Sequence, residues 1–279
     1  MIPIDFIYCR PDSLEEAAQT HAQLLKEGFS PVYYGGGSEI ITMARSGQIT
    51  PGAVIDIKRI PECNAMDMDK EYLAIGAANS LYRIKESKLF LPLGTTCGRI
   101  ADHTNQCRIT LGGNLCGTIQ YRESSLALLL CDAKLLLYGP DGMRITAMSD
   151  VFDGRMRLGE SEFIVQARIP VPLLQTKFFH IKKTAHEKID YPLISILALI
   201  QDGYLRIAFS GICTFPFRSE QIDGVLNNRS KPIADRLKEI PSLLPSKAKT
   251  DSKASASYRL FVLKRTLCNL LEEFEHGSV

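Results

Sequence analysis

Apolar residues recur at helical spacing near the start of the chain. Between Leu14 and Leu25 they fall at intervals of three and four residues, the period of an amphipathic helix. Ser13, followed three residues later by Glu16, forms a capping box of the kind that begins helices, and Gly28 is a common residue type at a helix end. The pattern predicts a helix that begins at Leu14 and ends just before Gly28.

Short apolar runs bounded by glycine, proline or aspartate predict strands in the next part of the chain. These predicted strands cover residues 31–34, 53–57, 72–75, 134–138 and 163–169. Helical patterns are predicted at residues 81–87, 93–102 and 123–131. This part of the chain is therefore expected to mix helices with short strands.

Pro170 and Pro172 close the last of these strands and mark the candidate boundary between two domains, residues 1–170 and residues 171–279. Beyond them a small antiparallel sheet and three helices are expected. The strands are predicted at 178–183, 193–201 and 204–212, and the helices at 219–226, 233–239 and 257–274. Residues 244–257 are rich in Ser, Lys and Ala, which predicts a surface linker or loose loop.

Charge and composition exclude some classes of function. The 279 residues include 33 Lys and Arg against 31 Asp and Glu, so the chain lacks the positive field typical of nucleic-acid-binding proteins. No apolar stretch approaches the roughly 18 residues that predict a membrane span. The first residues lack a basic segment and a signal cleavage site, so a cytoplasmic protein is expected.

The eight cysteines are scattered, and no two of them have the CxxC spacing typical of zinc or iron–sulfur ligation. We therefore expect no bound metal and interpret the cysteines as ordinary buried or half-buried thiols. If the chain takes part in redox chemistry, its cofactor is expected to be organic.

Two glycine-rich segments, residues 35–39 (GGGSE) and 110–114 (TLGGN), carry the candidate chemistry. Consecutive glycines permit positive φ and have no Cβ, so backbone N–H groups can converge on an anion. Ser38, Thr110 and Asn114 add short polar side chains where phosphate or ribityl oxygens need partners. The two loops together are suited to a diphosphate that is neutralised by backbone dipoles.

The same segments have an alternative interpretation as tight turns without a ligand, because glycine-rich turns are common. The first loop does not fit the GxGxxG pattern, since it lacks the third glycine and no strong helical pattern follows it. The chain also lacks the Gly-Lys-Ser/Thr of a Walker A loop. Glu39 is interpreted as a loop-capping carboxylate and Asp56 as a strand residue. The loops alone permit nucleotide binding without requiring it.

Taken together, the order and spacing of these segments resemble the flavin subunit of the xanthine dehydrogenase and carbon monoxide dehydrogenase family of molybdenum hydroxylases. The resemblance covers nearly the whole chain. Its motifs are SLEEA at 13–17, GGGSEI at 35–40, GAA at 76–78, TLGGN at 110–114 and ASASYR at 254–259. Each motif is weak by itself, and all of them in register are specific.

This resemblance implies an α+β fold. It consists of an FAD-binding region of two α+β subdomains, of the molybdopterin dehydrogenase type, and then a small C-terminal α+β domain with a three-stranded antiparallel sheet. The family's division agrees with the candidate boundary near Pro170. The resemblance also implies that FAD lies extended between these parts, with both glycine loops at its diphosphate.

The resemblance further implies which residues contact FAD. The first set is Tyr33, Tyr34, Gly35, Gly36, Gly37, Ser38, Glu39 and Ile40, and the second is Ala101, Thr110, Gly113 and Asn114. Glu123 stands where the family usually has an aspartate that hydrogen-bonds the cofactor. Ile164, or its neighbour Val165, matches an aliphatic residue that packs on the flavin ring. Lys183, or Lys182 one position earlier, matches a lysine near the ring.

The implied role is an electron relay without a catalytic residue of its own. Electrons would arrive from [2Fe–2S] clusters on a partner chain and leave to NAD or another acceptor, while a large molybdopterin subunit binds the substrate. A cation such as Lys183 would stabilise the anionic reduced flavin. Two alternatives remain open: a stand-alone FAD-linked oxidoreductase, and a non-catalytic nucleotide-binding or assembly protein that has lost the flavin.

Overall fold

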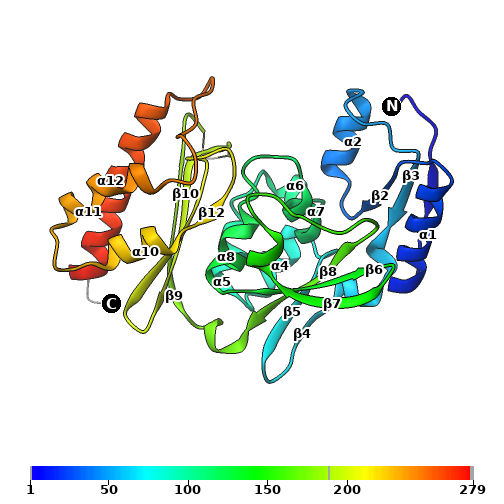
Figure 1. The fold of residues 1–279 in the computed structure, drawn as a ribbon, viewed down its shortest axis with the longest axis horizontal. Coiled ribbons are helices and arrows are strands. Elements are labelled where there is room, and N and C mark those ends of the chain that lie inside the picture. The colour runs from blue at the N-terminus through cyan, green and yellow to red at the C-terminus, as the bar shows by residue number, and fades with distance from the viewer. Residues whose placement is uncertain (1, 188, 277–279) are drawn as a thin grey trace.

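The computed structural model describes residues 2–187 and 189–276, and its three β-sheets follow one another along the longest axis of the molecule (Figure 1). A three-stranded sheet lies near the N-terminus, and a five-stranded sheet with a group of short helices occupies the middle. A four-stranded sheet covered by the last helices forms the C-terminal end. The α+β fold that the sequence predicts is confirmed.

The three-stranded sheet is parallel, in the order β1 (Ile7–Cys9), β3 (Ala53–Asp56), β2 (Pro31–Tyr34). Parallel strands need crossover connections, and α1 (Leu14–Lys26) and α2 (Ser38–Arg45) lie in these connections. Ser13 caps α1, as predicted, by accepting a 3.1 Å hydrogen bond from the Glu16 N–H. The apolar face of α1 shares one core with β3 and with residues of the five-stranded sheet.

The five-stranded sheet is antiparallel. Its order is β4 (Met66–Met68), β5 (Tyr72–Gly76), β8 (Phe163–Pro170), β6 (Lys134–Gly139), β7 (Gly142–Ala147). The helices of this part are α3 (Pro61–Asn64), α4 (Leu81–Ser87), α5 (Leu91–Cys97), α6 (His103–Gln106), α7 (Leu111–Cys116), α8 (Ser124–Leu130) and α9 (Met148–Val151). Nearly every residue of α8 is buried, because the four-stranded sheet and the helices α5, α7 and α9 pack around it.

The four-stranded sheet corrects the prediction of three strands. Its antiparallel order is β12 (Phe217–Arg218), β11 (Tyr204–Ser210), β10 (Pro192–Gln201), β9 (Lys177–Thr184). β12 has only two residues and follows Pro216, so no alternation of apolar and polar positions marks it in the sequence. One face of the sheet packs on α10 (Glu220–Asn227) and α12 (Ala256–His276), and the other on α5 and α8 (Figure 1). The helix α11 (Ile233–Glu239) packs on α10 and α12.

Residues from both sides of Pro170 share one apolar core, which includes Leu197, Leu199 and Ala208 of the four-stranded sheet together with residues of α5 and α8. The division into residues 1–170 and 171–279 therefore stays a prediction. Within residues 2–187 and 189–276, no helix combines the length and the apolar character needed to cross a membrane.

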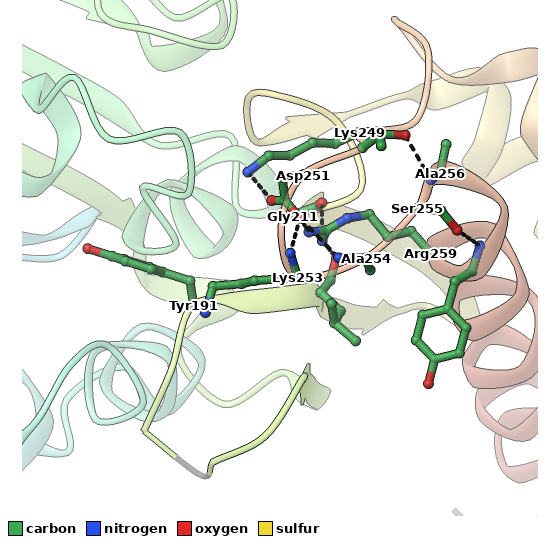
Figure 2. A network of polar contacts seen from close by, with 12 residues as sticks. Tyr191, Gly211, Lys249, Asp251, Lys253, Ala254, Ser255, Ala256 and Arg259 are labelled. Atoms are coloured by element: carbon green, nitrogen blue, oxygen red, sulfur yellow. Dashed lines mark hydrogen bonds and ion pairs between the residues drawn. The ribbon is translucent and has the colours of Figure 1, made fainter.

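The connection before α12 is held in place, whereas the sequence predicted a linker or loose loop. Figure 2 shows the polar network that holds it. Arg259 is fully buried and donates hydrogen bonds to the carbonyls of Leu193 at 2.6 Å and Gly211 at 3.0 Å and to Asp251 at 2.7 Å. Lys249 pairs with the other oxygen of Asp251 at 2.8 Å. Asp251 and Lys249, within the segment that was predicted to be loose, are thus joined through Arg259 to the sheet.

Candidate functional site

The first glycine loop connects β2 to α2 and touches the second glycine segment. A Cβ added to Gly36 would lie 1.6 Å from the carbonyl oxygen of Arg108, and one added to Gly35 would lie 2.5 Å from Oγ1 of Thr110. Gly37 has a φ of +70°, which lets the chain turn from strand into helix. The two backbones can meet only because these positions lack side chains.

The helix after this loop, α2, corrects the prediction that no helix follows it. Its eight residues, SEIITMAR, contain two adjacent isoleucines and a threonine, which lower helix propensity and hid it in the sequence. The helix begins at Ser38, and its first turn places Glu39 beside the segment that follows α7. Glu39 accepts hydrogen bonds from the N–H of Thr118 at 2.6 Å and from its hydroxyl at 2.7 Å. Glu39 thus caps that segment.

The second glycine segment is the first turn of α7, where a loop was predicted. Thr110 is the N-cap, and its Oγ1 accepts a 3.2 Å hydrogen bond from the Gly113 N–H. The N–H groups of Leu111 and Gly112 donate to the carbonyls of Asn79 and Ala77, both at 2.9 Å. The GAA motif at 76–78 therefore fixes the second glycine segment where the first can reach it.

Ser38 and Asn114, two of the predicted polar contacts, differ in whether their side chains already have a hydrogen-bond partner. The hydroxyl of Ser38 is buried and has no hydrogen-bond partner among the described residues. Asn114 is nearly buried, and its Oδ1 accepts a 2.5 Å hydrogen bond from the Ser124 hydroxyl, which joins α7 to α8. Ser38 is thus the side chain of the first loop with an unused polar atom.

A buried ion pair lies where the four-stranded sheet meets the middle part of the molecule. Oε2 of Glu123 is 2.9 Å from Nζ of Lys182, and the two side chains are 4% and 6% exposed. Lys182 also donates to the carbonyl of Arg99 at 2.7 Å, two residues before Ala101, whose φ is +53°. Oε1 of Glu123 is buried without a partner among the described residues. This half-used carboxylate is suited to accept a hydrogen bond from a ligand.

Lys183 does not share this position. In the β9–β10 register Lys183 lies opposite Ile194, and its side chain is exposed, whereas Lys182 points the other way. His180 is two residues before Lys182 on the same face of β9. Burial, together with the charges of Arg99 and Lys182, lowers the pKa of His180 to about 3, so this histidine is neutral at physiological pH.

Tyr33 is half-buried and Ile164 is buried. The Tyr33 hydroxyl donates to the carbonyl of Ser161 at 2.7 Å, and its ring stacks on His21 with centroids 4.5 Å apart. Burial raises the pKa of Tyr33. Ile164, in β8, is 4% exposed and belongs to the apolar core that also includes residues of α5 and α8. The ring of Tyr34 closes one side of the first loop, since a Cβ on Gly37 would lie 2.2 Å from it.

Sequence reasoning missed two groups of residues near these segments. Lys58 donates to the Gly35 carbonyl at 2.9 Å and pairs with Asp56 at 2.7 Å. The sequence signal that could have indicated this pair was the carboxylate of Asp56 at the end of a strand of apolar residues, AVID, which is fully buried. Tyr121 and Tyr191 stack with ring centroids 4.8 Å apart and join the segment after α7 to the one before β10. No local pattern predicts that contact, because the two tyrosines are far apart in the sequence.

These residues fit an extended dinucleotide such as FAD. Both glycine segments present backbone without Cβ atoms, and Ser38 and Glu123 each keep a buried polar atom unused. Gly35, Gly36, Ser38 and Thr110 would hold the diphosphate, and Glu123 would accept a hydrogen bond from the cofactor. FAD would supply the redox chemistry, which none of these side chains provides.

An α+β chain in which two glycine segments meet by close backbone contact is suited to bind a nucleotide. Residues 4–172 match the family described as the FAD binding domain in molybdopterin dehydrogenase, and this chain belongs to that family. The family predicted from the sequence motifs, its FAD cofactor and its oxidoreductase class are confirmed.

Relatives align over almost the whole chain. The glyceraldehyde dehydrogenase medium chain of Sulfolobus acidocaldarius is 26% identical over 276 residues, which cover 95% of this chain and 96% of that one. The carbon monoxide dehydrogenase medium chain of Afipia carboxidovorans is 26% identical over 93% of each chain. The solved structure of carbon monoxide dehydrogenase from Hydrogenophaga pseudoflava has a TM-score of 0.85 at 22% identity and 96% coverage of each chain, which shows the shared fold.

Proposed function

We propose that this chain holds the FAD of a molybdenum hydroxylase complex. It relays electrons from [2Fe–2S] clusters on one partner chain to NAD or another acceptor, while a large molybdopterin subunit binds the substrate. The observation that carries the proposal is the close backbone contact between Gly36 and Arg108, which brings the first glycine segment against the entry to the second. A cytoplasmic location and the two-domain division belong to the same proposal.

The role as one subunit of a complex is supported by the names of the relatives. Three of them are called medium chains, and one from Escherichia coli, 23% identical, is called a xanthine dehydrogenase FAD-binding subunit. Each term describes one chain among several. The alternatives, a stand-alone oxidoreductase or an assembly protein without flavin, predict different behaviour on purification.

Purified full-length chain mixed with FAD and then desalted is expected to keep the cofactor and to show flavin absorption bands. A colourless protein that takes up no FAD would favour the assembly protein.

Tagged chain expressed in its own host is expected to co-purify with an iron–sulfur chain and a molybdopterin chain. A flavin-loaded chain isolated alone, with a substrate turnover of its own, would favour the stand-alone enzyme. Bleaching of the flavin by NADH without oxygen would identify NAD as the acceptor.

Lys182 is proposed as the cation near the flavin, in place of its neighbour Lys183. Lys182→Met is expected to make the flavin reduction potential more negative, because a nearby ammonium group stabilises the anionic reduced flavin and the substitution leaves Glu123 unpaired. Lys183→Met removes the same charge from the exposed face of β9 and is expected to leave the potential unchanged. Spectroelectrochemical titration of both variants tests this. A shift in the Lys183 variant alone would restore Lys183 to the site.

A further inference from the structure

Behind the first glycine loop lies a cluster of three side chains that the proposed FAD site does not include. Asp56 at the end of β3 accepts hydrogen bonds from the Tyr8 hydroxyl at 2.6 Å and from the Lys58 ammonium at 2.7 Å. The same ammonium donates to the Gly35 carbonyl at 2.9 Å and lies 4.4 Å from the centroid of the Tyr34 ring. Lys58 therefore connects the loop to the sheet that supports it.

The charge of Asp56 makes this arrangement relevant to an anionic ligand. The Asp56 side chain is 4% exposed, and burial alone would raise its pKa. The hydrogen bonds from Lys58 and Tyr8 outweigh burial and hold the pKa of Asp56 below its usual value, so the carboxyl is ionised. A negative charge directly behind a diphosphate-binding loop opposes binding, and Lys58 neutralises it.

We propose that Lys58 is a positioning residue for FAD, an inference that rests on the proposed function. By holding the Gly35 carbonyl, it fixes the orientation of the peptide between Gly35 and Gly36. Glycine peptides have no side chain to restrict them, so an unheld loop must lose more conformational freedom when it binds an anion. Lys58 orders the loop before the cofactor arrives and compensates the charge of Asp56.

The test compares Lys58→Met with Lys58→Arg in the full-length chain. Lys58→Met is expected to weaken the binding of FAD and of ADP, which shares the diphosphate, by about tenfold, the order expected for losing a hydrogen bond to a charged group. At saturating FAD, the flavin absorption spectrum is expected to match that of the natural chain, because the change lies at the diphosphate. Lys58→Arg keeps the charge and its donors and is expected to retain most of the affinity.

Lys70→Met removes an exposed lysine from the β4–β5 turn and serves as the control, with unchanged affinity expected. Thermal unfolding of each cofactor-free variant establishes that it folds, and Lys58→Gln takes the place of the methionine variant if that one does not. Equal affinity of the natural chain and the Met variant for FAD would overturn the inference and leave the proposed function intact. An altered flavin spectrum in Lys58→Met, or no recovery in Lys58→Arg, would also overturn it. A natural chain that binds no FAD would instead contradict the proposed function.

Discussion

Replacing Gly36 by alanine is expected to weaken FAD binding by about one to two orders of magnitude, since overpacking of this kind typically costs about 1–3 kcal/mol. The added Cβ would lie 1.6 Å from the Arg108 carbonyl oxygen and 2.6 Å from its carbonyl carbon. Both atoms are backbone, so no flexible side chain can move aside. The two glycine segments must separate, which would open the proposed diphosphate site.

Isothermal titration with FAD measures this effect. The matched control is Gly224→Ala in α10, where an added Cβ meets nothing within 4 Å. Alanine is favoured over glycine inside helices, so this control is expected to bind FAD normally and to unfold at the same or a slightly higher temperature. A Gly36→Ala chain with the affinity of the natural chain would show that the contact between the two segments does not form the cofactor site.

Elements with a strong local signal were predicted from the sequence alone. α1 has a capping box and an apolar stripe, and both determine its structure without help from distant residues. β10 is a long apolar strand and β11 follows it after a tight turn, so their pairing was predictable as well. The motif resemblance supplied what periodicity cannot, namely the FAD cofactor.

The parts that were missed depend on contacts between distant segments. The hydrogen bond from Lys58 to Gly35 and the approach of Gly36 to Arg108 join elements that are far apart in the sequence, so no local pattern covers both partners. The choice between Lys182 and Lys183 illustrates the same limit. A shift of one residue along β9 exchanges the buried face for the exposed one, and only the register with β10 decides which lysine meets Glu123.

Arg259→Met is expected to destabilise the chain by about 3–5 kcal/mol, because it leaves two buried carbonyls without a donor, at about 1–3 kcal/mol each, and removes one partner of the half-buried ion pair with Asp251. Arg259 is 0% exposed and donates to Asp251 and to the carbonyls of Leu193 and Gly211 (Figure 2). Methionine fills part of the same space but donates no hydrogen bond, so the buried carbonyls of Leu193 in β10 and of Gly211, directly after β11, lose their partner.

The pH dependence of stability provides a second measurement. Burial alone would raise the pKa of Asp251, but hydrogen bonds from Lys249 and Arg259 and from backbone N–H groups hold it well below its usual value. A carboxyl with a lowered pKa in the folded state adds stability above its unfolded pKa, near 4, and loses that contribution as the pH falls further. The natural chain should therefore lose stability on acidification below about pH 4, and Arg259→Met should lose less, because part of the contribution is already absent.

Urea unfolding at pH 7 and at pH 3.5 measures both effects in one experiment. Arg265→Met is the matched control, since it removes an exposed arginine from the same helix, α12, and is expected to change the free energy of unfolding by less than about 0.5 kcal/mol at either pH. If Arg259→Met were as stable as this control, the network in Figure 2 would not hold α12 to the sheet. The connection before α12 would then be the loose segment that its composition predicted.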